Sequence, residues 1–228
     1  MIKINKEKDR GRGDFGWLKA NYSFSFSSYV NPQKTNFNSL KVMNEDFIQP
    51  EAGFPTHGHK DMEILTVVFK GVLGHTDSLG NIQELRPGRI QRMYAGSGIT
   101  HSEFNLSKTE VLNLMQIWIE PNQKGLAPEY NEKEFEFNKK GGQLLLSPTG
   151  RDESIRIYQN VEVFIFNFEK ENIDLELNEK EAYIHIVEGE LKVEEEIIEY
   201  GDSLEVKNKD VLSLRGIKEG KLLVFKFL

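Results

Sequence analysis

The sequence predicts an all-β protein of the sandwich or barrel type. Short apolar or alternating runs recur along the chain, and turn signals rich in glycine separate them. Helical periodicity is weak everywhere, and residues 128–134 are expected to form one short helix or an irregular linker. Many short strands at such spacing are typical of sandwiches and barrels. The predicted strands cover residues 64–69, 82–85, 111–119, 143–146, 154–158, 161–168, 182–187 and 222–227.

Composition and charge exclude several classes of protein. Cysteine is absent, so disulfides, zinc–thiolate sites and cysteine nucleophiles are ruled out, and any metal must be held by His, Asp or Glu. A net charge of −7 without a basic cluster argues against direct binding of nucleic acid. No apolar run approaches the roughly 20 residues that span a bilayer, and the first residues lack the apolar stretch of a signal peptide. We therefore expect a cytoplasmic protein that binds neither nucleic acid nor a membrane.

The chain is expected to form two domains. Its 228 residues suffice for two small cores, and the composition shifts near residue 125. Four of the five histidines precede this point, whereas Glu and Lys dominate the alternating strands after it. Residues 125–142 are the best linker candidate because they are rich in glycine, proline and charge. We place the N-terminal domain at 1–130 and the C-terminal domain at 131–228.

A weak internal repeat favours two barrels. The run 64–69 leads into Lys70-Gly71, and the run 184–187 leads into Glu188-Gly189, each with a further strand expected beyond the turn. In the same order, residues 86–88 and residues 200–202 each form a turn signal before another strand. Because the two pairs occur in the same order, they favour a duplicated barrel.

The sharpest local feature is His57-Gly58-His59. Residues i and i+2 of a strand point to the same face, so both imidazoles converge on one point. His101 and Glu103 have the same relation 44 residues later, after the turn Gly96-Ser97-Gly98. Two such pairs on facing strands would supply three neutral nitrogens and one carboxylate oxygen. That ligand set suits Fe(II), Mn(II), Ni(II), Cu(II) or Zn(II), and it does not suit Mg(II) or Ca(II).

A second carboxylate competes for the fourth position. Glu63 follows His59 by four residues with matching parity. The general cupin pattern, His-x-His-x3-Glu followed much later by a His, would select Glu63 as a ligand. Glu103 would then lie outside the ligand set or act as a base. The residues alone leave this choice open.

The two remaining histidines are expected to have structural roles. His75 lies beside the turn signal Gly74-His75-Thr76-Asp77, where a hydrogen-bonding loop histidine is common. His185 lies in an apolar run with no histidine two residues away. We interpret it as a packed strand residue and expect the C-terminal domain to be free of metal.

Long motifs of the chain resemble the pirin branch of the cupin superfamily. The segment 54–63 contains the His-x-His pair, and the segment 91–105 contains the second pair. The resemblance runs nearly from end to end. The other matching segments are 14–18, 22–26, 42–46, 86–88 and 116–119.

The resemblance implies a bicupin, with two antiparallel β-barrels of the double-stranded β-helix or jelly-roll type and a metal in the N-terminal barrel. The ligands that it implies are His57, His59, His101 and Glu103, which would leave Glu63 outside the ligand set. Fe(II) is the favoured ion, with Mn, Ni, Cu, Zn or Co as alternatives. The family often has a histidine near residues 12–14, and this chain has none there.

The resemblance also implies an enzyme, similar to quercetin 2,3-dioxygenase. In such a reaction a flavonol would offer a hydroxyl and a carbonyl oxygen to the metal, the metal would acidify the hydroxyl, and Glu103 would accept the proton. Dioxygen would then attack the ring and release carbon monoxide and an ester. An aromatic substrate needs an apolar cleft, for which Phe24, Phe26, Phe54 and Met62 are candidate walls.

The alternative function is regulation. Some pirins resemble redox-sensitive co-regulators that act through a protein partner, and an acidic chain permits such a partner. Oxygen-dependent turnover of a flavonol separates the two hypotheses.

Overall fold

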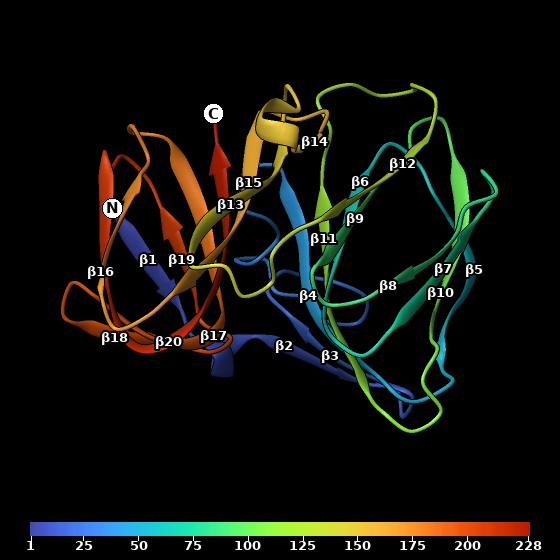
Figure 1. Ribbon diagram of the computed structural model, residues 1–228, viewed down its shortest axis with the longest axis horizontal. Coiled ribbons are helices and arrows are strands. Elements are labelled where there is room, and N and C mark those ends of the chain that lie inside the picture. The colour runs from blue at the N-terminus through green and yellow to red at the C-terminus, as the bar shows by residue number, and fades with distance from the viewer. The chain divides into compact units, whose positions relative to one another are not determined.

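The computed structural model describes all residues from Met1 to Leu228 and consists almost entirely of strands and turns (Figure 1). Its two helices are single 3-10 turns of three residues each. Neither of these short helices could span a bilayer. The all-β prediction is therefore confirmed. The chain divides into two compact units, which we call the histidine unit (residues 10–137) and the C-terminal unit (residues 1–9 and 138–228).

The histidine unit is built from two antiparallel sheets. The larger sheet has the strand order β12-β9-β6-β11-β4-β3-β2, and the smaller has the order β5-β10-β7-β8. Both sheets contribute residues to one internal cavity. The strands are β2 (Gly11–Asp14), β3 (Leu18–Tyr22), β4 (Leu40–Ile48), β5 (Gly53–His59), β6 (Glu63–Lys70), β7 (Leu73–Asp77), β8 (Ile82–Leu85), β9 (Arg89–Tyr94), β10 (Ile99–Asn105), β11 (Leu112–Ile119) and β12 (Glu129–Glu134).

The C-terminal unit is one nine-stranded sheet that bends around its own core. The path β1-β19-β17-β20-β15-β13-β14 is extended by β16, which pairs with β20, and by β18, which pairs with β17. Its elements are β1 (Ile2–Asn5), η1 (Glu7–Asp9), β13 (Gly141–Ser147), η2 (Arg151–Glu153), β14 (Ile155–Arg156), β15 (Val161–Phe168), β16 (Asn172–Glu176), β17 (Glu181–Val193), β18 (Glu196–Glu199), β19 (Ser203–Val206) and β20 (Val211–Phe227).

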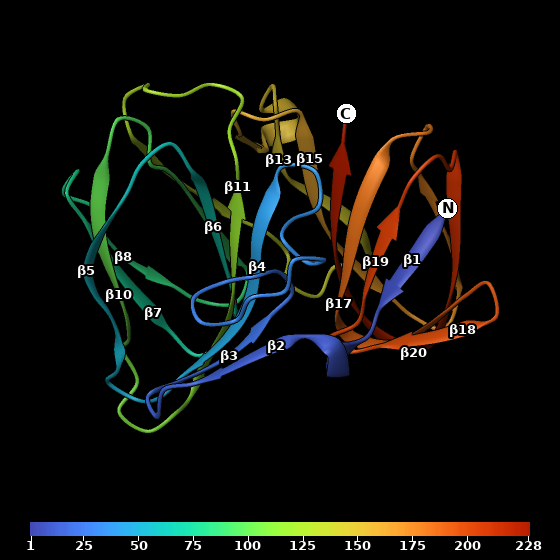
Figure 2. The same cartoon turned by 180° about the vertical axis from the view of Figure 1, so that it is seen from behind.

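The boundary between the units differs from the expected division into 1–130 and 131–228. Strand β1 is antiparallel to β19, with Ile2 opposite Val206, so the N-terminal residues belong to the C-terminal unit (Figure 2). Strand β12 pairs along its whole length with β9, which keeps residues 131–137 in the histidine unit. Both differences arise from strand pairing over long sequence distances, which local composition does not report.

Residues 128–134 are neither a helix nor an irregular linker. Tyr130 and Glu132 lie in β12, and the Tyr130 hydroxyl donates to Glu132 and contacts the side chain of Gln91. The segment lacks the apolar alternation of an ordinary strand because β12 is an edge strand with half-exposed side chains. Its pairing with β9 overrides its weak local preference.

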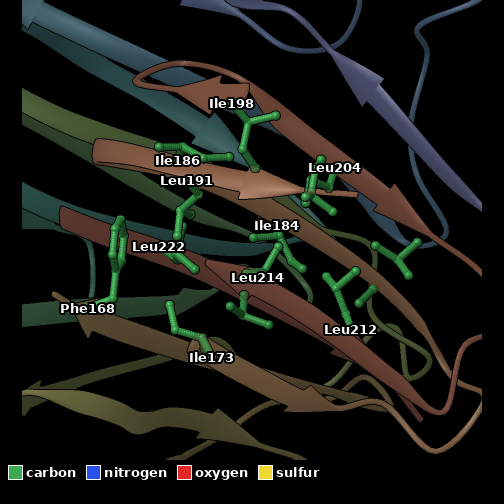
Figure 3. Close-up of a cluster of buried hydrophobic side chains, with 14 of the residues drawn as sticks. Phe168, Ile173, Ile184, Ile186, Leu191, Ile198, Leu204, Leu212, Leu214 and Leu222 are labelled. Atoms are coloured by element: carbon green, nitrogen blue, oxygen red, sulfur yellow. The ribbon is translucent and has the colours of Figure 1, made fainter. Parts of the chain in front are cut away.

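The core of the C-terminal unit is aliphatic. Alternate residues of β17 and β20 point inward, so Ile184, Ile186 and Leu222 meet at the centre (Figure 3). The backbones of β17 and β20 approach closely at Gly189 and Gly220, where the pairing of the two strands shifts register. A Cβ at Gly220 would lie 1.9 Å from the Glu188 carbonyl oxygen, so only glycine fits there. The turn expected at Glu188-Gly189 of the repeat is thus a bend within one continuous strand, β17.

Candidate metal centre

Two histidines of the site lie on one face of an edge strand. His57 and His59 are alternate residues of β5, both half-buried, with ring centroids 4.8 Å apart. The edge position tolerates Pro55, which has no backbone N–H to donate to a neighbouring strand. The pairing of β5 with β10 shifts register between residues 101 and 103, opposite this part of β5. The predicted parity of the pair is present in the structure.

His101 completes a cluster of three imidazoles. It lies on β10 directly opposite His57, and its ring centroid is 4.4 Å from that of His57 and 5.0 Å from that of His59. The pairs therefore occupy neighbouring strands of one sheet. One ligand atom from each of the three histidines lies within 4.8 Å of the others. His101 is 2% exposed, and neither of its ring nitrogens has a hydrogen-bond partner in the protein.

The protonation of these rings suits a metal. The Nδ1 of His57 is 2.9 Å from the Pro55 carbonyl oxygen, which only accepts, so Nδ1 carries the hydrogen and the lone pair of neutral His57 is on Nε2. Burial, followed by the proximity of His57, lowers the pKa of His59 to about 4. Burial and the neighbouring histidines lower the pKa of His101 to about 3. Both rings are therefore neutral near pH 7, as metal ligands must be.

Glu103 lies on the same face of β10 and is 1% exposed. Its carboxylate accepts hydrogen bonds from Gln116 Nε2 at 2.8 Å and from the Thr66 hydroxyl at 3.4 Å. Burial raises its pKa to about 7, although these hydrogen bonds lower it. One oxygen of Glu103 lies within 4.8 Å of a ring nitrogen of His101. The buried, unpartnered nitrogens of His101 and this neighbouring carboxylate fit a divalent metal that prefers nitrogen and oxygen ligands.

Glu63 does not contact the histidine cluster. The turn at residues 60–62 separates β5 from β6, which belongs to the other sheet, so the parity counted from His59 is not preserved. Its carboxylate accepts two hydrogen bonds from Arg92, at 2.6 and 2.9 Å, and both side chains are almost fully buried. Glu63 is therefore committed to a buried ion pair.

His75 is a strand residue of the site, in contrast to the expected loop histidine. It lies in β7 opposite Glu103, is 1% exposed, and its Nε2 is 3.1 Å from Asp77 Oδ2. Its ring is 5.3 Å from that of His101 and 4.9 Å from that of Tyr130. Its remaining nitrogen has no hydrogen-bond partner. The prediction of a loop histidine was wrong because the turn expected at residues 74–77 begins only after Asp77.

The histidines open into a cavity of about 200 Å³ with apolar walls. Two of the four aromatic or apolar candidates, Phe26 and Phe54, line this cavity. Phe24 and Met62 do not; Phe24 is buried, and Met62 packs on a separate apolar cluster that contains Ile64 and Met93. The remaining apolar lining is Leu18, Ala20, Tyr22, Ile64 and Trp118.

Sequence reasoning missed several residues of the cavity. Trp118 stands edge-on to His59 at 4.9 Å and to Phe26 at 5.5 Å. The polar residues Asn44, Asp46 and Gln116 also line the cavity. Burial and then the charges of Glu103 and Glu45 raise the pKa of Asp46 to about 8. The sequence contains a pattern that could have indicated these cavity residues, because polar residues stand at positions 44, 46 and 116 of otherwise apolar strands.

The sequence of the chain matches models of known protein families. A model of the pirin family matches residues 4–119, which is more than half of the chain. The chain belongs to the pirin family. A second model, described as the quercetinase C-terminal cupin domain, matches residues 144–227. The predicted two-domain cupin architecture is thereby confirmed.

Full-length relatives agree with this assignment. A quercetin 2,3-dioxygenase of Escherichia coli K12 is 37% identical over 227 residues, covering 99% of this pirin and 98% of the relative. The crystal structure of YhhW from Escherichia coli has a TM-score of 0.96 at 36% identity, covering 100% of this chain and 98% of that one. A second structure, bacterial pirin YhhW in complex with nickel(II), has a TM-score of 0.95 at 37% identity and covers 100% and 99% of the chains.

Proposed function

We propose that this pirin holds one divalent transition metal on His57, His59, His101 and Glu103 and cleaves a flavonol such as quercetin with dioxygen. The observation that carries the proposal is the convergence of three imidazoles, with both buried nitrogens of His101 lacking any partner, in a cavity with aromatic walls. The nickel(II) complex of YhhW and the names of the full-length relatives support it. Fe(II) is our choice for the native ion because the reaction consumes dioxygen, and the ligand set also accepts other ions of the same series.

The residues of the cavity have distinct parts in this reaction. When bound, the metal supplies Lewis acidity that lowers the pKa of the flavonol 3-hydroxyl. Glu103 accepts the hydroxyl proton, because its carboxylate lies beside the histidines and lines the same cavity. Gln116 and Thr66 hold the Glu103 carboxylate in position through their hydrogen bonds. The products are carbon monoxide and an ester.

The apolar walls position the substrate. Phe26, Phe54 and Trp118 give flat surfaces on which an aromatic ring stacks, and they exclude water from the reacting atoms. Such walls suit a planar, weakly polar ligand better than a sugar or a peptide.

The test compares oxygen uptake and loss of flavonol absorbance in metal-free protein, metal-reconstituted protein and the reconstituted His59→Ala variant. We expect turnover only in the reconstituted wild type. His185→Gln is the matched control, because it changes a buried histidine of the other unit. Equal rates in all samples would overturn the enzyme proposal, and a protein partner captured only in one metal state would then favour the regulatory function.

A further inference from the structure

The segment Asn44-Glu45-Asp46 of β4 carries three polar residues in the interior of the histidine unit. Their exposed fractions are 2%, 3% and 3%. Alternation along the strand sends the middle residue to the face opposite that of its two neighbours. Asn44 and Asp46 line the cavity, whereas Glu45 does not.

The two faces differ in how the polar groups are satisfied. The Glu45 carboxylate accepts hydrogen bonds from Arg10 and from Asn21, both at 3.3 Å. On the cavity side, neither Asn44 nor Asp46 makes a side-chain hydrogen bond with another protein group, and the Asn44 Oδ1 is buried without a partner. Buried polar groups in native proteins are nearly always paired. Strand β4 therefore pairs the Glu45 carboxylate on its far face and leaves the polar side chains of Asn44 and Asp46, on its cavity face, available to a ligand.

The position of the pair relative to the metal ligands is set by the sheets. Asn44 lies opposite Gln116 on the neighbouring strand β11, and Gln116 holds Glu103. Asn44 and Asp46 belong to the seven-stranded sheet, whereas the four proposed ligands belong to the four-stranded sheet. Both sets line the same cavity, together with Phe26, Phe54 and Trp118. A single aromatic molecule in this cavity is therefore offered polar groups from two sheets.

We infer that Asn44 and Asp46 form a hydroxyl-binding subsite that selects polyhydroxylated aromatic ligands over those whose only polar group is the chelating hydroxy-ketone. The inference rests on the proposed function, because it supposes that a flavonol occupies the cavity. An amide and a carboxyl group both accept hydrogen bonds from phenol hydroxyls, and the apolar walls offer no competing partner. A site built to bond a hydroxyl discriminates strongly against analogues that lack it.

The test is an anaerobic titration of Zn(II)-reconstituted protein with quercetin and with 3-hydroxyflavone, followed by the shift in flavonol absorbance. The two ligands share the chelating pair, and only quercetin carries further hydroxyls. In Asn44→Leu and in Asp46→Leu, we expect the affinity for quercetin relative to 3-hydroxyflavone to fall about tenfold, the value of one good hydrogen bond. Asp46→Asn, which still bonds a hydroxyl, should retain most of the preference.

Asn113→Leu is the matched control. Asn113 lies on the adjacent strand β11, and its side chain reaches Glu45 rather than the cavity. The affinity of Asn113→Leu for quercetin relative to 3-hydroxyflavone should equal that of the wild type. All variants should retain one equivalent of zinc. Asn44→Leu should also melt no lower than the wild type, because it removes an unpaired polar group; if the leucine variant does not fold, Asn44→Ala removes the amide without adding volume.

Three results would overturn the inference. An unchanged ratio of affinities in the variants would mean that Asn44 and Asp46 do not read hydroxyls, and it would leave the proposed function intact. Loss of zinc from the Asn44 or Asp46 variants would assign these residues to the metal centre. Failure of both flavonols to bind the wild type would overturn the proposed function together with the subsite.

Discussion

The two units of this pirin share a strand architecture and differ in what fills it. In the C-terminal unit, the inward positions hold aliphatic and aromatic residues such as Ile184, Leu191 and Leu222, which pack on one another (Figure 3). In the histidine unit, inward positions of β4, β5 and β10 hold Asn, Asp, His and Glu around a cavity. The polar residues cost stability where they lack partners, so the comparison separates a unit built for packing from a unit built for binding.

Within the histidine unit, the buried carboxylates inside the cavity and those outside it differ in their partners. Glu63 and Arg92 in the histidine unit neutralise each other outside the cavity, whereas Glu103 and Asp46 lie within it with raised pKa values. Carboxyl groups with such pKa values are typical of functional sites. Glu45 and Glu63 of the same unit are paired with arginines, so their pairing distinguishes them from the carboxyl groups of the cavity.

The largest effect is expected from His101→Ala. Loss of a ligand should weaken metal binding more than about 100-fold, since even residues that only orient ligands cost roughly 10- to 100-fold. Elemental analysis after dialysis should find one metal per chain in the wild type and none in the variant. The wild type should also melt higher with metal than without it, because a ligand that binds only the native state stabilises it. A variant with a full equivalent of tightly bound metal would disprove the assigned site.

Packing in the C-terminal unit is tested by Leu222→Ala. Leu222 is fully buried in the aliphatic core, so this change should lower the free energy of unfolding by about 2–5 kcal/mol, as measured by urea denaturation. Metal content should not change. Leu79→Ala is the control, because Leu79 is 46% exposed and should cost less than about 0.5 kcal/mol. A small effect at Leu222 would contradict its place in a packed core.

Substitution of Glu63 and substitution of Glu103 should affect different properties of the protein, stability in the first case and metal binding in the second. Glu63→Gln removes one charge of a buried pair and should lower the free energy of unfolding by about 3–5 kcal/mol, while metal content stays the same. Glu103→Gln should weaken metal binding and abolish activity. Calorimetric titration with metal distinguishes them. The reverse pattern would place this protein with the general cupin ligand scheme.

Metal affinity should depend on pH through Glu103. Without metal, its pKa is about 7, so below that pH the metal must displace a proton. The affinity should therefore rise about tenfold per pH unit as the pH approaches 7 and should change less above it. The pKa values of His59 and His101, about 4 and 3, place their protonation below this window. Glu103→Gln should reduce the slope of the profile between about pH 5.5 and 7; an equal slope in wild type and variant would assign the proton to another group.

The smallest effect is expected from His185→Gln. His185 is the only histidine of the C-terminal unit and is fully buried in β17. Because the unit offers no second histidine, we predict that metal content and affinity remain those of the wild type. A second equivalent of metal that disappears in this variant would contradict the assignment of metal to the histidine unit alone.

Features that depend on neighbouring residues could be predicted from the sequence. Apolar alternation and turn signals predicted the fold class, and two predicted strands, 82–85 and 161–168, coincide with β8 and β15. Parity along a strand placed His57 beside His59 and His101 beside Glu103 on common faces. The family resemblance selected Glu103 over Glu63 as the ligand, and that choice stays a prediction. The parity inferences were correct because strand alternation is a local property of the backbone.

Which distant segments meet could not be predicted from the sequence and is seen in the folded chain. Strand β1 joins β19 from the opposite end of the chain, and β12 becomes a strand because β9 is available as its partner. Glu63 turns to Arg92 because β5 and β6 enter different sheets, so parity cannot be counted through the turn between them. His75 reaches His101, and Asn44 and Asp46 reach the cavity, through pairings of β7 with β10 and of β4 with β11. Periodicity tells which face of a strand a residue occupies, and the partners of that face are set by strand register and sheet closure, which involve the whole chain.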